Sequence, residues 1–381
     1  MQKINPDLLK NNIEKIAFYD FNNNKGFGAA YCVMQGNEVV YEKYFGHTSA
    51  EGTEPVAPST MFRLASMTKP VTAVATLILV ERGLLSLGDR VADYLPEFSK
   101  LRIKEIKDNG EEIDLGEAKT DITLWHLLTH TSGFGSNPVK IQKTTEQDKA
   151  SIANYIRFNL AAGLDFEPGT RELYSGTAAF DVLVNIIEKV TGMDYLSFLK
   201  KEIFEPCDMA NTTFVPSPKQ WGQIIAMHNK VDGKNCNAEM KENCVFSDFP
   251  CTHYLGGAGL ASTLGDYSRF AKMLLNKGKT PQKRILKEET LRLMHTLIVP
   301  EEIKPHVERW GLGVRVIVKE EYKTLPVGTF GWSGAYGSHF WVDPINQVAA
   351  VFMKNSLFDG GAANESARNF EKAVNDSFNL D

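Results

Sequence analysis

The order of secondary-structure patterns along the chain predicts an α+β fold of the α/β sandwich type. A hairpin pattern occurs at residues 28–46, and β-rich segments return only in the last quarter of the chain. Helical patterns fill most of the region between them. A parallel sheet would instead require strands and helices to alternate. We therefore expect an antiparallel sheet flanked by helices in a domain made of residues 1–62 and 304–381, with a mainly helical domain inserted at 63–303.

The first helix and the hairpin that follows it have clear local signals. Asn5 can cap a helix whose first position is Pro6, and apolar residues then recur at helical spacing. The segments GAAYCVMQ and EVVYEKYFG are rich in strand-forming residues, and Gly36-Asn37 between them suits a two-residue turn. These signals predict a helix followed by an antiparallel hairpin.

The middle of the chain is mainly helical. Residues 66–82 are apolar on nearly every side, which predicts a buried helix that ends at Gly83. The polar stretch 107–117 predicts an excursion on the surface, and 215–258 a long irregular segment. The other expected helices begin near Thr123, where one runs to Gly133, and after Ser262, and lie at about 150–160, 177–191, 194–204 and 287–297.

Strand patterns dominate the last quarter. WGLGVRVIV (310–318), TFGWSGAYG (329–337) and SHFWVDPINQVAAVFMKN (338–355) have a β-rich composition, and Asp343-Pro344 predicts a turn in the last of them. A closing helix is expected at about 362–378. The simplest packing joins the first hairpin and these strands in one antiparallel sheet.

Composition and charge exclude several classes of partner. The net charge is −5 over 381 residues and no basic run is present, so we expect neither nucleic acid nor an anionic membrane surface as a partner. The longest apolar run, at 71–80, is too short to cross a membrane. The five cysteines are odd in number, and the N-terminal sequence lacks an apolar signal-peptide core. Together these features predict a cytoplasmic protein with free thiols.

Ser66 and Lys69 are the first candidates for chemistry. A serine hydroxyl is a poor nucleophile until a base takes its proton, and a neutral lysine amine can be that base. Residues three apart on a helix lie on the same face, so Ser66 and Lys69 can touch. Ser66 would also lie at the positive end of the helix dipole, beside free backbone N–H groups. The alternative is an N-cap and a surface charge on an ordinary buried helix.

The spacing Ser-x-x-Lys is not specific by itself. A second match, Ser197 to Lys200, lies inside a helical pattern and runs into further charges, so we interpret Lys200 as a solvated charge. Ser66 differs because it opens an almost wholly apolar helix. Its context therefore favours catalysis more strongly than its spacing does.

Two later segments strengthen the catalytic interpretation. In PGTRELYSG, Tyr174 follows a Pro-Gly turn and precedes a helix, where it can act as a base beside a charged lysine. In TFGWSGAYGSHF, several glycines interrupt a strand, which often marks the close approach of a ligand or of another backbone. The alternatives are a packing tyrosine and a bulged edge strand without function.

Taken in order, these segments resemble the serine β-lactamase and penicillin-binding protein superfamily. The motifs that carry the resemblance are Ser66-Met-Thr-Lys69, Tyr174-Ser-Gly and Trp332-Ser-Gly, supported by HLLTHTSGF, EPGTRELYSG and GGAGLASTLGDYSRFAKMLL. The similarity runs from about residue 25 to about residue 355. Within the superfamily, the chain resembles the branch of class C β-lactamases, D-alanyl-D-alanine carboxypeptidases and family VIII carboxylesterases, and those esterases most of all.

The resemblance implies a β-lactamase/transpeptidase-like fold and a role for each motif. Ser66 would be the acylated nucleophile, Lys69 would assist it, and Tyr174 would be the general base. The backbone N–H groups of Ser66 and Ala335 would form the oxyanion hole. No cofactor and no metal is implied.

Two positions depart from the β-lactamases and peptidases of that superfamily. Gly176 stands where they usually have an asparagine that holds the amide of the substrate. Trp332-Ser333-Gly334 stands where they usually have Lys-Thr-Gly or His-Thr-Gly, whose cation helps to bind the substrate carboxylate. An indole offers one N–H and no charge. We therefore expect Gly176, Trp332, Ser333 and Gly334 to contact a neutral substrate.

A hydrolase with a Ser-His-Asp triad is one competing interpretation. Its nucleophile elbow has the pattern Gly-x-Ser-x-Gly. The nearest match is 331–335, with Ser333 at its centre and alanine in the last position. An elbow requires a helix next, yet the segment that follows is typical of a strand.

A metal-dependent hydrolase is a second competing interpretation. Five possible ligands cluster in sequence without zinc-binding spacing: His228, Cys236, Cys244, Cys251 and His253. His126 and His130 are four residues apart and are expected on one helix face, a geometry that can bind metal, but no His-Glu-x-x-His pattern joins them. A third interpretation is a non-catalytic penicillin-sensing domain, which would be tied to a membrane.

The sequence therefore predicts a serine hydrolase that acts through an acyl-enzyme. A carboxylesterase acting on small neutral esters is the expected activity. The alternatives are a β-lactamase or D-alanyl-D-alanine carboxypeptidase-like penicillin-binding protein, with a β-lactam-like substrate.

Overall fold

A seven-stranded antiparallel sheet lies at the centre of the computed structural model, which describes residues 2–107, 111–137, 139–140, 143, 145–240, 245–246, 254–362 and 364–379. In spatial order its strands are β2 (Glu38–Gly46), β1 (Gly28–Gln35), β13 (Val348–Met353), β12 (His339–Asp343), β11 (Phe330–Ser333), β10 (Arg315–Ile317) and β9 (Glu308–Trp310). The N-terminal hairpin therefore joins the C-terminal strands in one sheet. This confirms the predicted α+β class.

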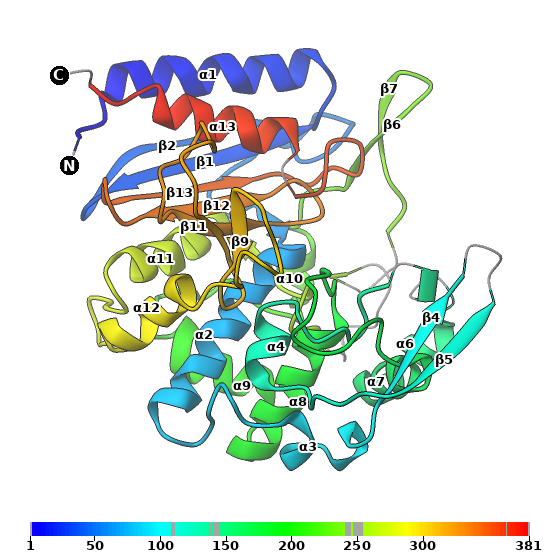
Figure 1. Ribbon diagram of the computed structural model, residues 1–381. Coiled ribbons are helices and arrows are strands. Elements are labelled where there is room, and N and C mark those ends of the chain that lie inside the picture. Colours follow the sequence, from blue (N-terminus) through cyan, green and yellow to red (C-terminus); the bar gives the residue numbers. More distant parts are fainter. Residues whose placement is uncertain are drawn as a thin grey trace.

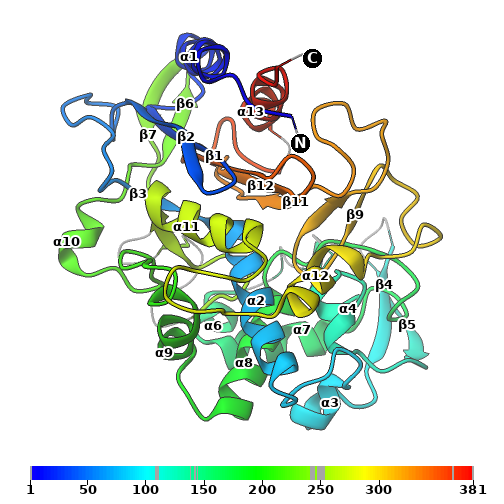
Figure 2. The same cartoon turned by 90° about the vertical axis from the view of Figure 1, so that its left-hand side faces the viewer.

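Helices cover both faces of this sheet, as Figure 1 shows. On one face, α1 (Pro6–Asn22) and α13 (Glu365–Asn375) lie side by side, with the two termini close together. On the other face, α11 (Leu264–Leu275) packs against β1, β12 and β13. Figure 2 shows the same layers after a quarter turn. Strands β1, β12 and β13, at the centre of the sheet, are therefore buried on both sides.

Strand β1 has apolar side chains on both faces of the sheet. Alternate residues point to opposite sides of a strand. Ala30, Cys32 and Met34 enter the large core shared with the helices below, whereas Tyr31 and Val33 enter the smaller core under α1 and α13. The strand therefore reads as one continuous apolar run rather than as an alternation.

Helix α2 (Thr68–Glu81) runs through the middle of the helical layer below the sheet. Every residue from Thr68 to Leu79 is buried, and the helix ends before Gly83, as the sequence predicts. Its start differs from the expectation, because Ser66 lies in a separate 3-10 turn, η1 (Ala65–Met67). The backbone of Ala65 is left-handed, with φ +44°, so the chain bends sharply just before α2 begins.

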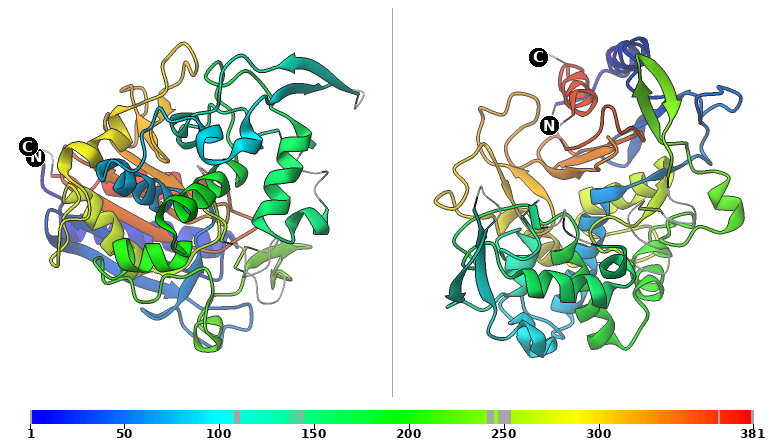
Figure 3. Two further views of the ribbon diagram at one scale, coloured as in Figure 1. Left: turned by 90° about the horizontal axis from the view of Figure 1, so that it is seen from below. Right: turned by 90° about the vertical axis from the view of Figure 1, so that its right-hand side faces the viewer.

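Most of the remaining helices lie in the layer below the sheet, which Figure 3 shows from below. Those that pack on α2 include α8 (Ala178–Thr191) and α12 (Glu288–Thr296). The others are α3 (Val91–Tyr94), η2 (Pro96–Phe98), α4 (Leu124–Leu128), α6 (Glu146–Lys149), α7 (Ile152–Ala162), α9 (Tyr195–Leu199), the π-helical turn η3 (Lys200–Phe204) and α10 (Pro218–Trp221). Helix α11 contacts the sheet although it falls within 63–303, and the expected domain boundaries stay a prediction.

Two expected elements were wrong in detail, and the expected surface excursion is confirmed but forms regular structure. The segment 310–318 is not one strand but two, β9 and β10, because the chain turns at Gly313, where φ is +69° and a Cβ would lie 2.7 Å from Ala73 Cβ. The surface excursion 107–117 belongs to a hairpin of β4 (Arg102–Ile106) and β5 (Glu112–Glu117). The irregular stretch 215–258 contains α10 and a second hairpin, β6 (His228–Val231) with β7 (Lys234–Asn237).

One pairing was not anticipated. The short strands β3 (Met61–Arg63) and β8 (Ala261–Thr263) form their own two-stranded sheet immediately before η1. Leu64 then accepts and donates further backbone hydrogen bonds, including one from its N–H to the Leu260 carbonyl at 2.8 Å. This pairing fixes the chain just ahead of Ser66.

In the part of the chain that the structure describes, no helix combines the length and the apolar composition that a membrane crossing requires.

Candidate active site

Ser66, Lys69 and Tyr174 meet although they come from two distant parts of the chain. Tyr174 Oη donates a hydrogen bond of 2.7 Å to Ser66 Oγ. Lys69 Nζ lies 3.4 Å from the same oxygen. Both groups that the sequence assigns to proton transfer therefore converge on the hydroxyl that the sequence assigns to nucleophilic attack.

The turn that carries Ser66 is held in a strained conformation. A left-handed backbone costs an L-residue such as Ala65 about 1–2 kcal/mol. Hydrogen bonds from other elements fix the turn: Tyr267 Oη donates to the Met67 carbonyl at 2.8 Å, and the Leu260 N–H donates to Thr68 Oγ1 at 3.2 Å. The packing of α11 and of the chain before β8 thus presents Ser66 at the start of α2.

Lys69 is fully buried and its amine is held by backbone oxygens. Nζ donates to the Gly176 carbonyl and, at 2.8 Å, to the Gly257 carbonyl. These two acceptors leave one position on the nitrogen facing Ser66 Oγ. In the neutral amine that position is a lone pair that can accept the serine proton, and in the ammonium ion it is an N–H that can return it.

Aromatic rings surround Tyr174. Its ring lies 4.5 Å from the His130 ring, 5.6 Å from the Trp310 ring and 5.5 Å from the Trp332 ring, measured between centroids. Trp332 Nε1 also donates to Tyr174 Oη at 3.3 Å. The phenol oxygen is therefore fixed between an indole N–H and Ser66.

His130 packs beneath Tyr174 as a neutral ring. Burial, with the charges of Lys69 and Lys304 adding to it, lowers the pKa of His130 well below its usual value. Its Nδ1 accepts the backbone N–H of Ser175 at 3.1 Å. Sequence reasoning did not assign His130 to this site, although HLLTHTSGF was among the motifs that carried the resemblance.

A pocket of about 340 Å³ opens over these groups. It is lined by Ser66, Glu172, Tyr174, Lys304, Trp310, Trp332, Ser333, Ala335, Gly361 and Ala362. Five predicted site residues are thus brought together, and Ser66 and Ala335, whose N–H groups were assigned to the oxyanion hole, both line it. A larger hollow, of about 730 Å³ beside α11, contains none of the predicted residues.

Two predicted contact residues do not line this pocket. Gly176 contributes its carbonyl to Lys69 instead. Gly334 packs against the turn that precedes Ser66, because a Cβ on it would lie 2.4 Å from the Leu64 carbonyl oxygen. Gly334, directly after β11, therefore allows the close approach of another backbone.

We expect Gly334→Ala to destabilise the protein, whereas Gly176→Ala should have little effect on stability. The added methyl at 334 forces the backbone at Leu64 to move, and overpacking of this kind costs about 1–3 kcal/mol. Nothing lies within 4 Å of a Cβ at 176. Urea denaturation of the two variants and the parent checks this, and equal midpoints for all three would contradict it.

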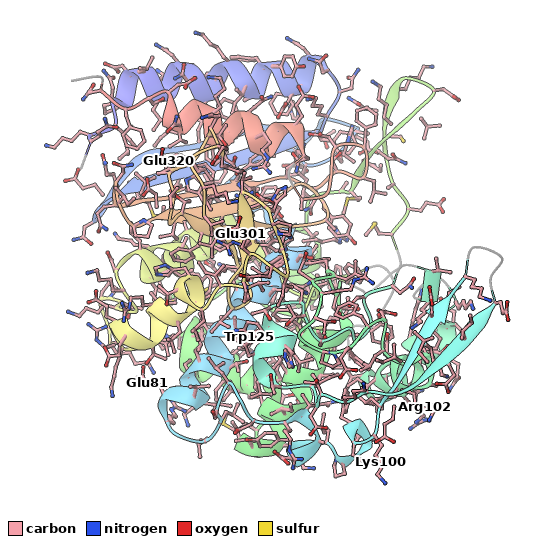
Figure 4. The ribbon with its side chains drawn as sticks, viewed as in Figure 1. Glu81, Lys100, Arg102, Trp125, Glu301 and Glu320 are labelled. Carbon is pink, nitrogen blue, oxygen red and sulfur yellow. The ribbon has the colours of Figure 1, made fainter. Side chains whose placement is uncertain are left out.

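Five residues of the pocket were missed by sequence reasoning: Glu172, Lys304, Trp310, Gly361 and Ala362. Lys304, in the loop between α12 and β9 where Figure 4 labels Glu301, places Nζ 3.0 Å from Glu172 Oε2. Trp310 Nε1 donates to Glu172 Oε1 at 2.7 Å. Glu172 lies in the stretch EPGTRELYSG and Trp310 opens WGLGVRVIV, but neither pattern shows that Glu172 meets Trp310 and Lys304.

The possible metal ligands are not assembled in the described residues, where no group of three or more His, Cys, Asp or Glu side chains is arranged to hold an ion. Both ring nitrogens of His228 are hydrogen-bonded, to Ser356 and to Asn235. The expectation that His126 and His130 share a helix face was wrong, since α4 ends at Leu128 and His130 has φ +59°. The candidates at 244, 251 and 253 lie outside the described residues.

Ser333 is not in a nucleophile elbow. It ends β11 and is followed by a turn and by β12, whereas an elbow joins a strand to a helix. Its hydroxyl nevertheless lies 2.8 Å from His339 Nδ1, and His339 Nε2 lies 3.0 Å from Glu371 Oε1. Sequence reasoning did not find this pairing of Ser333 with a histidine and a carboxylate.

Comparison with known families agrees with this geometry. The chain matches the family described as Beta-lactamase over residues 20–373. The chain belongs to the beta-lactamase family. This is a family of serine hydrolases, so the resemblance and the enzyme class predicted from the sequence are confirmed.

Relatives and solved structures cover nearly the whole chain. Esterase EstB of Burkholderia gladioli is 27% identical over 362 residues, which cover 87% of this chain and 87% of EstB. The D-alanyl-D-alanine-carboxypeptidase/endopeptidase AmpH of Escherichia coli K12 is 24% identical over 360 residues, covering 91% and 83%. The structure of EstCE1, a hydrolase with promiscuous acyltransferase activity, has a TM-score of 0.81 at 22% identity and covers 97% of this chain and 99% of its own. This last similarity confirms the expected β-lactamase-like fold.

Proposed function

We propose that this protein is a carboxylesterase that hydrolyses small neutral esters through an acyl-enzyme on Ser66. The charge balance of the pocket carries this proposal. Among the described residues that line it, Lys304 is the one cation and Glu172 the one carboxylate, and they pair with each other. A substrate anion would therefore have to compete with Glu172 for Lys304.

Trp332 supports the same substrate class. It occupies the position where a cation would bind a substrate carboxylate, and its N–H is directed to Tyr174 Oη. An indole at this place contributes an apolar wall and no charge. The name of EstB, an esterase, is in keeping with this proposal.

Acylation begins with the attack of Ser66 Oγ on the ester carbonyl carbon. The serine proton leaves toward Tyr174 and Lys69, which both contact that oxygen. The carbonyl oxygen becomes an oxyanion, which the backbone N–H groups of Ser66 and Ala335 stabilise. When the bond to the alkoxide oxygen breaks, the same proton is delivered to it and the alcohol leaves.

Deacylation repeats the sequence with water. Tyr174, assisted by Lys69, accepts a proton from water as the water oxygen bonds to the acyl carbon, and it releases its own hydrogen, which is directed at Ser66 Oγ, toward that oxygen. The bond to Ser66 Oγ then breaks, and the proton returns to that oxygen. The products are the carboxylic acid and the free enzyme, so no cofactor takes part.

Parallel steady-state hydrolysis of p-nitrophenyl butyrate and of a chromogenic cephalosporin tests the proposal, with Ser66→Ala as the control. The expected kcat/KM for the ester exceeds that for the anionic cephalosporin by about one to two orders of magnitude, the value of one charge-assisted hydrogen bond. Both activities should vanish in the control. A cephalosporin turnover equal to or above that of the ester would contradict the proposal.

We also propose the cytoplasm as the location, as the odd number of cysteines suggests. In keeping with it, Cys32 and Cys207 are buried free thiols.

A further inference from the structure

A buried row of polar groups leads from the pocket to the far side of the sheet. Ser333 on β11 lines the pocket and lies directly opposite His339 on β12. His339 lies between the Ser333 hydroxyl, 2.8 Å from Nδ1, and Glu371 of α13, 3.0 Å from Nε2. All three side chains are almost fully buried, with residue exposures of 2%, 1% and 0%. The acylation and deacylation steps use neither His339 nor Glu371.

Glu371 is held as a carboxylate. Burial raises its pKa, but the positive charge of Arg315 and the hydrogen bond from His339 more than offset this and hold the pKa of Glu371 well below its usual range. Arg315 Nη2 donates to Oε1 at 2.9 Å. Tyr322, Thr324 and Arg368 also donate to this carboxylate. An ionised carboxylate can only accept hydrogen bonds, so Nε2 of His339 must carry a proton.

The state of His339 then fixes the direction of the Ser333 hydroxyl. Burial lowers the pKa of His339, Glu371 opposes the effect and Arg315 adds to it, so the ring is neutral near pH 7. A neutral imidazole with its proton on Nε2 has a lone pair on Nδ1. The Ser333 hydroxyl therefore donates its hydrogen to His339, and the oxygen keeps only lone pairs for the pocket.

We propose that His339 and Glu371 are positioning residues that make Ser333 a hydrogen-bond acceptor toward the substrate, and that this excludes carboxylate-bearing substrates. A carboxylate also only accepts, so the two oxygens repel each other. A neutral ester meets no such repulsion, and one with an O–H or N–H near its acyl group gains a hydrogen bond to Ser333. This inference rests on the proposed function and refines its substrate class.

The direct test measures the ratio of kcat/KM for a chromogenic cephalosporin to that for p-nitrophenyl butyrate in the parent, His339→Phe, Ser333→Ala and the double variant. In His339→Phe the Ser333 hydrogen is released and can turn toward the substrate carboxylate. We expect this ratio to rise by about fivefold to fiftyfold, within the range of a hydrogen bond to a charged group. In the double variant the ratio should return to that of Ser333→Ala.

Ser333→Ala keeps the inference testable should His339→Phe fail to fold. If Ser333 only accepts, removing its oxygen leaves the ratio unchanged or raises it. If Ser333 donates to the carboxylate, the ratio falls by about tenfold or more. A fall of that size in Ser333→Ala, or an unchanged ratio in a folded His339→Phe variant, would overturn the inference.

The tautomer of His339 can also be observed without any substrate. Two-bond ¹H–¹⁵N correlation spectra of protein labelled with ¹⁵N-histidine, with Ser333→Ala to help assign the ring, should show Nε2 protonated and Nδ1 unprotonated at pH 7. A proton on Nδ1 would overturn the inference. If the parent enzyme does not hydrolyse the ester, the proposed function fails instead. The failure of the inference about Ser333 and the failure of the proposed function are therefore distinguishable.

Discussion

Ser66→Ala is expected to lower kcat for ester hydrolysis by about three orders of magnitude or more, because no acyl-enzyme can form without the hydroxyl. Ser66 Oγ is the atom on which Tyr174 Oη and Lys69 Nζ converge. The change removes one oxygen from a half-buried side chain, so the fold should be retained. Steady-state kinetics with p-nitrophenyl butyrate and a thermal unfolding curve of the same sample measure both effects.

Ser333→Ala is the matched control for this prediction. Ser333 is the other serine hydroxyl of the pocket, and it contacts a histidine that in turn contacts a carboxylate. Residual turnover in Ser66→Ala that disappears when Ser333 is also changed would assign the nucleophile to Ser333. That outcome would contradict an acyl-enzyme on Ser66.

Lys69→Met and Tyr174→Phe should each lower kcat by about two orders of magnitude or more, with strongly non-additive effects when combined. Each removes one of the two groups that contact Ser66 Oγ, and a relay missing either part cannot use the other. Methionine replaces the buried Lys69 stem with an apolar chain of similar length, although it leaves the Gly176 and Gly257 carbonyls without their donor. Kinetics of the two single variants and the double variant give the coupling.

The double variant decides between two views of this pair. If Lys69 and Tyr174 act as one unit, the double variant is no slower than the slower single variant. If each contributes independently, the two losses multiply. Multiplying losses would contradict a shared proton relay, and loss-free single variants would contradict any role in it.

Much of the site could be predicted because its catalytic residues lie in short, local sequence patterns. Ser66 and Lys69 are three residues apart, and the apolar run after them predicts a buried helix. Tyr174 and Trp332 each lie in a motif that carries the resemblance. The sheet could be predicted because its hairpin and its last strands are strongly β-forming. That Ser66, Tyr174 and Trp332 lie together in space could be expected only from the β-lactamase-like fold that the resemblance implied.

Other features depend on contacts between segments that have no local signal. The 3-10 turn at Ser66 arises from the left-handed backbone of Ala65, a residue that seldom adopts it. The Glu172–Lys304 pair joins residues 132 positions apart. Ser333 and His339 are six positions apart and become partners only through the register of β11 and β12. The available signal was the turn between β11 and β12: a register worked out from it would have placed Ser333 opposite His339.

Active-site labelling tests the central claim, that Ser66 is the nucleophile, most directly. A fluorophosphonate forms a P–O bond to an activated serine as fluoride leaves, and mass spectrometry of a tryptic digest locates the adduct. Cleavage separates the two candidates, because Ser66 lies in the peptide 64–82, in which the Lys69-Pro70 bond resists trypsin, and Ser333 lies in the peptide 324–354. We predict one adduct, on Ser66, and none in Ser66→Ala. An adduct on Ser333, or labelling that persists in Ser66→Ala, would contradict the claim.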